Sequence, residues 1–499
     1  MSRRCTLGVD IGTSSSKGVL VDPDGRIVAS STSAHEVSRP RAGWVEMDGR
    51  IWWDEFVALA RDLVRQVPDA EITAVGVSGM GPCVLLVDED DEPVRPAILY
   101  GVDTRADQQV TRMTEELGDA EIVALGGSRL SSQAAGPKIV WVAEEEPDAF
   151  ARSRRLFMPA SWLARKLTGA YVLDHQSASQ TTPLYDIERE RWDADMWARY
   201  AGDVEPPRLA WAGDLAGTVT GTAAAETGIP AGTPVIVGTI DAWTEAVSVG
   251  AHGDGDLMLM YGTTMFLVAT GSATLRTPSM WTTVGAFAGT RNLAGGLATS
   301  GALTAWVKDL TGADFPELLA GAEASGIGGR GLLMLPYFAG ERTPILDPDA
   351  RGLIAGLTLR HTAGDLYRAA LEATAFGVRH NVETMREAGA DIRRIVAVGG
   401  GTQGRLWLQI VSDVTGLVQE VPEITIGASY GAAFLAATAV AEDTPPSITE
   451  WNPVSTVIEP EASVAAAYDE LYRLYVELYL NTREITHALA QGQRAEGEQ

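Results

Sequence analysis

Hydrophobic residues along this chain follow two alternating patterns, one typical of strands and one typical of helices. Residues 6–30 contain three short apolar stretches separated by turn residues, which predicts a β-meander. From Ile51 to Val67 apolar residues recur at helical spacing, and an apolar run at 72–78 follows, so we expect a helix and then a buried strand. The tail from about Ala462 also has helical spacing, and its stripe of tyrosines and leucines predicts core packing.

The second half of the chain repeats the pattern of the first. Residues 256–269 again show an apolar stretch, a Gly-Thr turn and a second apolar stretch, which indicates a duplicated architecture. Between the halves, the segment Val249–Gly255 interrupts the hydrophobic pattern with three glycines. We therefore expect an N-terminal domain over residues 1–248 and a C-terminal domain over residues 249–499.

Composition and charge narrow the classes of partner. The chain has 499 residues, of which 45% are hydrophobic, and this length is too great for one core. The formal net charge of −27 argues against nucleic acid and against an anionic membrane surface, so small-molecule partners are expected. No apolar run reaches the roughly 20 residues of a membrane span.

The cysteines and histidines exclude further classes of site. Only Cys5 and Cys83 are present, so a disulfide framework is not expected. The first residues are too polar for a signal peptide, and we expect a reducing, cytoplasmic location. The six histidines show no paired spacing of the kind that binds transition metals.

Two turns carry residues suited to phosphate. Gly12–Ser15 and Gly262–Thr264 each place Gly-Thr and a further hydroxyl residue between apolar strands. Each alone is equally typical of an ordinary hairpin, but their recurrence favours a pair of turns that grip one polyphosphate. Asp10, just before the first turn, is placed to hold hydrated Mg²⁺, and Lys17 adds a positive charge.

A glycine-rich segment near the end of the chain suits a nucleotide. Residues 394–413 show an apolar strand, a glycine loop and a helix, which lets a flat ligand approach the backbone. The loop also satisfies GxGxxG, with Glu420 at the distance of a ribose-binding acid, so NAD binding is an alternative. The alternative is disfavoured because too few residues follow to complete a dinucleotide-binding domain and because the Asp10 motif would be unexplained.

Asp241 is the candidate catalytic base. The apolar run 234–240 predicts a strand that delivers this carboxylate at its C-terminal end, before a helix over 244–248. A sugar hydroxyl has a pKa far above neutrality, so its attack on a γ-phosphate benefits from a carboxylate that accepts the proton. The residue alone is equally consistent with a helix N-cap.

Together these segments resemble the FGGY family of carbohydrate kinases, from about residue 6 to 440. The N-terminal signature of the family is met only in part, because Ala135 stands where Pro, Ser or Thr is expected. The segments that carry the resemblance are Gly8–Lys17 (phosphate 1), Tyr261–Thr264 (phosphate 2), Val398–Arg405 (adenosine), Gly352–Leu357 with Asp365–Glu372 (C-terminal signature) and Lys138–Glu145 (N-terminal signature).

The resemblance implies an α/β protein of two ribonuclease H-like domains, of the actin, hexokinase and Hsp70 superfold, with a cleft between them. It implies ATP and Mg²⁺, with Asp241 as general base and Asp10 as the metal-associated aspartate. The N-terminal domain would bind the sugar and the C-terminal domain would supply the second phosphate loop and the adenosine loop. The implied ATP-binding residues are Gly12, Thr13, Ser14, Ser15, Lys17, Gly262, Thr263, Thr264, Gly301, Gly400, Gly401, Gln403 and Gly404.

The sugar pocket departs from the pattern of xylulokinase-like members. Gly79–Pro82 replaces their Gln-Met-His, so an imidazole that contacts substrate is missing. A xylulose-like pentulose is the first expected substrate. The alternatives are ribulose, erythritol or another polyol, an aldonate and, from another class, an actin-like or Hsp70-like ATPase without a sugar. A homodimer is left open, and the pocket candidates, some equally consistent with surface loops, are Met80, Gly81, Asp103, Gln133 and Asp241.

Overall fold

The computed structural model describes residues 3–425 and 427–497, which form two compact units. Unit 1 comprises Met1–His252, Ser272–Asn292 and Gly427–Pro453, and unit 2 comprises Gly253–Gly271, Leu293–Ile426 and Val454–Gln499. The chain first leaves unit 1 at His252, near the glycine-rich segment, but it returns to unit 1 twice. The units are therefore not two consecutive halves of the chain.

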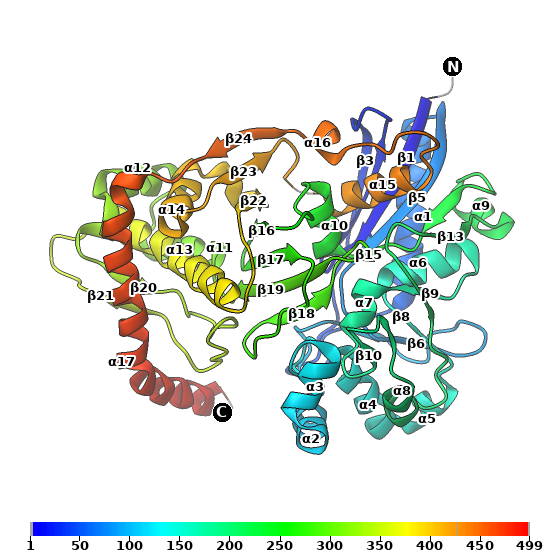
Figure 1. Cartoon of the computed structure of the whole chain (residues 1–499), viewed down its shortest axis with the longest axis horizontal. Helices are drawn as coiled ribbons and strands as arrows, with labels where there is room; N and C mark the ends of the chain where they lie inside the picture. The colour runs from blue at the N-terminus through cyan, green and yellow to red at the C-terminus, as the bar shows by residue number, and fades with distance from the viewer. Residues whose placement is uncertain (1–2, 426, 498–499) are drawn as a thin grey trace. The chain divides into compact units, whose positions relative to one another are not determined.

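Unit 1 is built on a mixed β-sheet with the strand order β13-β14-β5-β1-β2-β3, in which β15 also pairs with β5 (Figure 1). The strand β1 is antiparallel to β2 and parallel to β5, and β2 is antiparallel to β3, which confirms the predicted meander. The strands are β1 (Arg3–Ile11), β2 (Ser15–Val21), β3 (Ile27–Ala34), β5 (Ala70–Gly79), β13 (Leu215–Thr218), β14 (Pro234–Ile236) and β15 (Thr239–Ile240).

Helices α1 (Gly49–Gln66) and α15 (Ala428–Ala439) cover opposite faces of this sheet. Gly18 on β2 faces α1, since a Cβ there would lie 2.9 Å from Leu63 Cδ1. Gly8 faces the other way, and a Cβ there would lie 2.0 Å from the carbonyl oxygen of Ser429. Successive strand residues alternate between faces, so the sheet is buried on both sides.

The remaining elements of unit 1 surround the carboxyl ends of these strands and the sheet edge. They are β4 (Glu46–Met47), β6 (Leu85–Val87), β7 (Ala97–Ile98), α2 (Asp107–Leu117), α3 (Asp119–Gly126), α4 (Ala135–Glu145), α5 (Pro147–Arg152), β8 (Arg155–Phe157), α6 (Pro159–Thr168), β9 (Val172–Asp174), α7 (His175–Ser179), β10 (Tyr185–Asp186), β11 (Arg191–Trp192), α8 (Ala194–Tyr200), β12 (Arg208–Ala210), α9 (Gly221–Thr227), α10 (Asp241–Ser248), β18 (Trp281–Val284) and α16 (Ile448–Trp451).

Unit 2 repeats the strand pairing of unit 1. Strand β16 is antiparallel to β17 and parallel to β22, as β1 is to β2 and β5, which confirms the duplicated architecture and the α/β class with two ribonuclease H-like sheets. The strand order through this unit is β19-β17-β16-β22-β23-β24. These strands are β16 (Asp256–Tyr261), β17 (Met265–Gly271), β19 (Arg291–Leu297), β22 (Arg394–Val398), β23 (Gln419–Pro422) and β24 (Val454–Ile458).

Helices pack around the second sheet. The long helix α13 begins at a capping box in which Thr362 and Asp365 bond each other's backbone N–H groups. The other elements of unit 2 are α11 (Gly301–Thr311), α12 (Phe315–Ser325), η1 (Ile327–Arg330), β20 (Leu333–Leu335), β21 (Leu353–Ala355), α13 (Ala363–Glu387), η2 (Gly400–Gln403), α14 (Arg405–Thr415), η3 (Ala462–Val464) and α17 (Ala465–Gly497).

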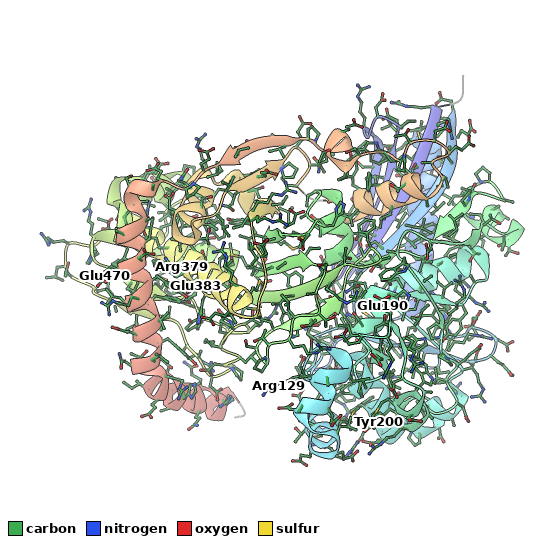
Figure 2. The ribbon with its side chains drawn as sticks, in the orientation of Figure 1. Arg129, Glu190, Tyr200, Arg379, Glu383 and Glu470 are labelled. Carbon is green, nitrogen blue, oxygen red and sulfur yellow. The ribbon has the colours of Figure 1, made fainter. Side chains whose placement is uncertain are left out.

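The C-terminal helix α17 uses its aromatic stripe to pack against unit 2, as the spacing predicted. Tyr468 and Tyr475 are buried, whereas Leu474 on the same helix is exposed. Arg379 of α13, labelled in Figure 2 with its partner Glu383, adds an ion pair to Asp469 of α17 at 2.7 Å. Across the described ranges, every helix is too short or too polar to cross a membrane.

The contact between α15 and the sheet gives a first prediction. A Cβ on Gly76 of β5 would lie 2.0 Å from the carbonyl oxygen of Ala432, and backbone cannot move aside as a side chain can. We expect Gly76→Ala to lower the free energy of unfolding by at least about 1–3 kcal/mol, the cost of an overpacked core. Urea unfolding followed by circular dichroism measures this loss.

The matched control is Gly221→Ala in α9, where an added Cβ meets nothing within 4 Å. That change should leave the protein unaltered or stabilise it by up to about 1 kcal/mol, because alanine favours a helix over glycine. Equal unfolding midpoints for the two variants would contradict the tight contact of α15 with β5.

Candidate active site

Asp10 stands at the end of β1, where the chain enters the first Gly-Thr turn. Its strand neighbours are Lys17 on β2 and Ser78 on β5. The side chain is buried, and its Oδ1 has no hydrogen-bond partner within the part of the chain that the structure describes. Burial raises the pKa of Asp10 well above its usual range, and the nearby negative charge of Asp241 raises it further.

The turn after β1 has its carbonyl groups bonded to the protein and two amides open. The carbonyl of Ser15 accepts the N–H of Gly12 at 3.1 Å, and the carbonyl of Ser14 accepts the N–H of His35 at 3.1 Å. The carbonyl of Gly12 lies 3.1 Å from Nε2 of His35. Among the described residues, the N–H groups of Thr13 and Ser14 meet no acceptor. Two adjacent free amides form a concavity suited to an anion such as phosphate.

Asp241 is the first residue of α10, directly after β15. The predicted single strand over 234–240 is wrong, because it is broken at Gly238, which has a φ of 74° and passes close to the carbonyl of Val77. The N-cap of α10 is Ile240, and Asp241 Oδ1 accepts the N–H of the next residue, Ala242, at 2.7 Å. The helix thus begins three residues earlier than expected, and Asp241 is not its cap.

Asp241 is half-buried. The protein around it displaces most of the neighbouring water, and this desolvation raises the pKa of Asp241 to about 6. At neutral pH the group is therefore mostly ionised, yet it is a stronger base than an ordinary aspartate. These are the properties that a general base for a hydroxyl requires.

Glu245 is a third carboxylate of this cluster, one that the motifs did not predict. It lies one helical turn after Asp241 on α10, and its oxygens accept the N–H of Gly427 at 3.1 and 3.2 Å. Burial and the charge of Asp241 raise the pKa of Glu245 to about 7, and Lys17 opposes that rise. The i,i+4 spacing from Asp241 was the available signal, because such residues share a helix face.

The carboxylate cluster fits a magnesium ion better than a metal held by protein alone. In the described ranges, no three His, Cys, Asp or Glu side chains are arranged to hold a metal together. Mg²⁺ usually binds one or two carboxylates and completes its shell with water and substrate phosphates. The unpartnered Oδ1 of Asp10, on a carboxylate near the negative charges of Asp241 and Glu245, suits such a shared ion.

The predicted nucleotide segments of unit 2 come together around the end of β16. The N–H of Gly301 donates to the carbonyl of Gly262 at 2.9 Å, and a Cβ on Gly301 would lie 2.6 Å from that oxygen. A Cβ on Gly401 would lie 2.8 Å from Tyr261 Cβ, so the glycine loop packs on the same strand end. The other predicted residues of these segments are Thr263, Thr264, Gly400, Gln403 and Gly404, of which Thr263, Gly400 and Gln403 are exposed.

The GxGxxG segment does not continue as a dinucleotide-binding domain. Strand β23 follows the helix after this loop and is parallel to β22, but the next strand, β24, is antiparallel. Glu420 forms an ion pair with Arg394. The segment is therefore a single glycine loop in the second ribonuclease H-like sheet, and the NAD-binding alternative is excluded.

The predicted sugar residues all lie in unit 1 but differ in exposure. Gly81 and Gln133 are half-buried, whereas Met80 and Asp103 are fully buried. Asp103 accepts the N–H of Val45 at 2.6 Å and pairs with Arg105 at 2.7 Å. This arrangement favours a structural role for Asp103, in holding its loop, over direct contact with a ligand.

Lys138 joins the two loops that carry Asp103 and Gln133. Its Nζ donates to the carbonyls of Leu99 at 2.7 Å, Tyr100 at 2.9 Å and Ser132 at 2.7 Å. Burial lowers the pKa of Lys138 to about 8, so its ammonium group still has all three protons at neutral pH. Lys138 belongs to the segment that resembles the N-terminal signature. Its structural role is to hold the two loops together.

Comparison with known proteins agrees with this geometry. The N-terminal and C-terminal domain models of the FGGY family of carbohydrate kinases match residues 5–248 and 257–440. Xylulose kinase of Bacillus subtilis (strain 168) is 28% identical over 503 residues, which cover 97% of this chain and 98% of that protein. Glycerol kinase of Nocardia farcinica is 31% identical over 467 residues, or 88% of this chain and 90% of that protein. The crystal structure of xylulose kinase from Rhodospirillum rubrum has a TM-score of 0.91 at 29% identity, covering 97% of this chain and 100% of that chain.

Two ribonuclease H-like sheets, each with a Gly-Thr turn after its first strand, place the chain in the actin- and hexokinase-like fold class. Within that class the chain belongs to the FGGY family of carbohydrate kinases. It is a sugar phosphotransferase and uses ATP as its phosphoryl donor. The non-sugar ATPase considered from the sequence is excluded.

The contacts of Lys138 predict a large cost for its removal. Lys138→Met keeps the length of the side chain but removes the donor to the carbonyls of Leu99 and Ser132, while that of Tyr100 keeps the N–H of Asp103. An unsatisfied buried group costs about 1–3 kcal/mol. We expect a lower unfolding midpoint in urea. Lys308→Met, on the half-exposed surface of α11, is the control and should leave the midpoint unchanged. A Lys138→Met midpoint equal to that of the control would contradict the role assigned here.

Proposed function

We propose that this carbohydrate kinase phosphorylates a xylulose-like pentulose, with Asp241 as general base. The observation that carries the proposal is the half-buried Asp241, which directly follows β15 and whose pKa is raised to about 6 by burial. The substrate class is supported by the curated xylulose kinases, of which that of Bacillus subtilis aligns over 97% of this chain. We also propose that the protein is cytoplasmic.

Asp241 performs the proton transfer in this mechanism. As the sugar oxygen attacks the γ-phosphorus in line, its proton passes to an oxygen of the Asp241 carboxylate. The other oxygen, Oδ1, is held by the N–H of Ala242, which fixes the carboxylate at the start of α10. No covalent intermediate with the protein is required.

The turn after β1 binds phosphate groups of ATP in this proposal. The N–H groups of Thr13 and Ser14 donate to phosphate oxygens, and Lys17 contributes a positive charge nearby. Asp10, with its unpartnered Oδ1, would hold Mg²⁺. The ion would supply positive charge that screens the phosphate groups. The proposed nucleotide residues of unit 2 are those around Gly262, Gly301 and Gly401.

A polyol is the second candidate substrate, because the glycerol kinase of Nocardia farcinica has the higher identity of 31%. The segment Gly79–Pro82 offers no imidazole, and Met80 within it is buried, so this wall of the proposed pocket is apolar. Fewer polar contacts at this wall reduce discrimination between a pentulose and a smaller polyol. The choice between them is therefore an experimental one.

A substrate panel tests the proposed specificity. Purified protein with ATP and Mg²⁺ is assayed for ADP release with D-xylulose, D-ribulose, glycerol, erythritol and D-gluconate. We expect the highest kcat/KM for D-xylulose, by about tenfold or more, which corresponds to roughly 1.4 kcal/mol of transition-state discrimination. A higher kcat/KM for glycerol would show that a polyol, and not a pentulose, is the preferred substrate. Release of ADP that no member of the panel stimulates would contradict both.

Replacement of the base tests the mechanism. Asp241→Asn keeps the size of the side chain but removes the proton acceptor, so kcat should fall by at least about 10²-fold. The affinity for a non-hydrolysable ATP analogue, measured by calorimetry, should stay within about twofold of wild type.

The control for this variant is Asp193→Asn, at the N-cap of α8, where the side chain accepts the N–H of Met196 at 3.0 Å. Asparagine is also a good N-cap, so activity should be unchanged. Near-normal turnover in Asp241→Asn, with the control also active, would remove Asp241 from the mechanism.

A further inference from the structure

His35 contacts the phosphate turn from the protein side, and no sequence motif singled it out. It follows β3 directly, and its side chain is almost fully buried, with 6% of its surface exposed. Its backbone N–H donates to the carbonyl of Ser14, and its ring Nε2 lies 3.1 Å from the carbonyl of Gly12. One residue therefore holds two of the carbonyl groups of this turn.

The other ring nitrogen of His35 is held by Glu55 of α1. Nδ1 lies 2.9 Å from Glu55 Oε2, whose carboxylate also accepts the hydroxyls of Ser16 at 2.5 Å and Ser33 at 3.1 Å. The imidazole is therefore held at both ring nitrogens, at Nδ1 by Glu55 and at Nε2 by the carbonyl of Gly12.

This arrangement determines which way the turn faces. A peptide group is planar, so fixing the carbonyl of Gly12 fixes the N–H of Thr13 on the opposite side. Fixing the carbonyl of Ser14 likewise limits the rotation of the peptide groups beside it. The N–H groups of Thr13 and Ser14, which have no acceptor among the described residues, are thereby kept on the side away from His35.

We propose that His35 is a positioning residue for ATP, which holds the amides of the first phosphate turn in their binding orientation. The inference rests on the proposed role of this turn in phosphate binding. The Nε2 bond to Gly12 orients the turn, while the Nδ1 bond to Glu55 anchors the ring to α1. Neither atom touches the substrate, so His35 acts through the turn.

Two amide substitutions separate these bonds. In His35→Gln the side-chain nitrogen lies near the position of Nε2, so the bond to Gly12 can be kept. In His35→Asn it lies near the position of Nδ1, so only the bond to Glu55 can be kept. A residue that merely supplies a hydrogen bond to Glu55 would be replaced at least as well by asparagine. A residue that orients the turn would be replaced better by glutamine.

The experiment measures the KM for ATP at saturating sugar, the KM for the sugar at saturating ATP, and the affinity for a non-hydrolysable ATP analogue by calorimetry. We expect His35→Asn to raise the KM for ATP and to weaken analogue binding by about fivefold or more, the effect of losing the hydrogen bond to the carbonyl of Gly12. We expect His35→Gln to stay within about twofold of wild type. The KM for the sugar should stay within about twofold in both variants.

The matched control is His361→Asn in unit 2. The Nε2 of His361 also lies near a backbone carbonyl, that of Arg330 at 3.2 Å, but it contacts no predicted nucleotide segment. This variant should keep all three constants. Equal analogue affinity in wild type and His35→Asn would overturn the inference, and so would equal losses in His35→Asn and His35→Gln.

Failure of this inference and failure of the proposed function give different results. If Asp241→Asn loses turnover while His35→Asn keeps its affinity for the analogue, the function stands and the positioning role falls. If wild type binds no analogue, the proposed phosphate site falls and this inference falls with it. Thermal unfolding of each variant shows whether a change in affinity accompanies a folded protein.

Discussion

Unit 1 depends on the direct backbone contact between helix α15 and the sheet. At Gly8 and Gly76 a side chain as small as a methyl group would overlap the helix backbone, and at Gly431 a Cβ would lie 2.0 Å from the carbonyl of Thr244 in α10. Helix α15 therefore touches β1, β5 and α10 at close range. These three elements carry Asp10, Ser78 and Asp241, so the approach of one helix determines how the carboxylate cluster is assembled.

The carboxylate cluster explains how a chain with a net charge of −27 is suited to a polyanionic substrate. Asp10, Asp241 and Glu245 are desolvated together, and each raises the cost of ionising another. A cation relieves this repulsion and also attracts phosphate. The positive groups next to the cluster are local ones, namely the turn amides and Lys17. Local geometry outweighs the long-range charge here because neighbouring groups in a poorly hydrated site are weakly screened.

Much of the fold was predictable because its signals are local in sequence. The meander at 6–30, the helix at 51–67 and the strand, glycine loop and helix at 394–413 all follow from hydrophobic spacing and turn residues. The break at Gly238 was not predictable, because it comes from the close approach of Val77, a residue distant in sequence. The second return of the chain to unit 1 was not predictable either, because the sequence of residues 427–453 does not indicate which unit they pack in.

The site shows the same division between local and distant information. Asp10 and Asp241 were found because each carboxylate ends an apolar strand, which a single sequence displays. Glu245 and His35 were missed because their importance lies in partners 182 and 23 residues away, Gly427 and Gly12. Asp103 shows the opposite case: a polar residue after a strand suggested a ligand contact, but its oxygens are taken up by Arg105 and Val45.

The order in which the chain completes unit 1 has a consequence for its synthesis. Residues Gly427–Pro453, which include α15, leave the ribosome only after the first two segments of unit 2 have been made, and Val454–Gln499 follows them. Until then one face of the first sheet, lined by the glycines that receive α15, has no cover. The N-terminal part cannot finish folding as an independent domain during translation, unlike the usual sequence of one domain after another. Each unit therefore completes its own core only when the last segments of the chain have been synthesised.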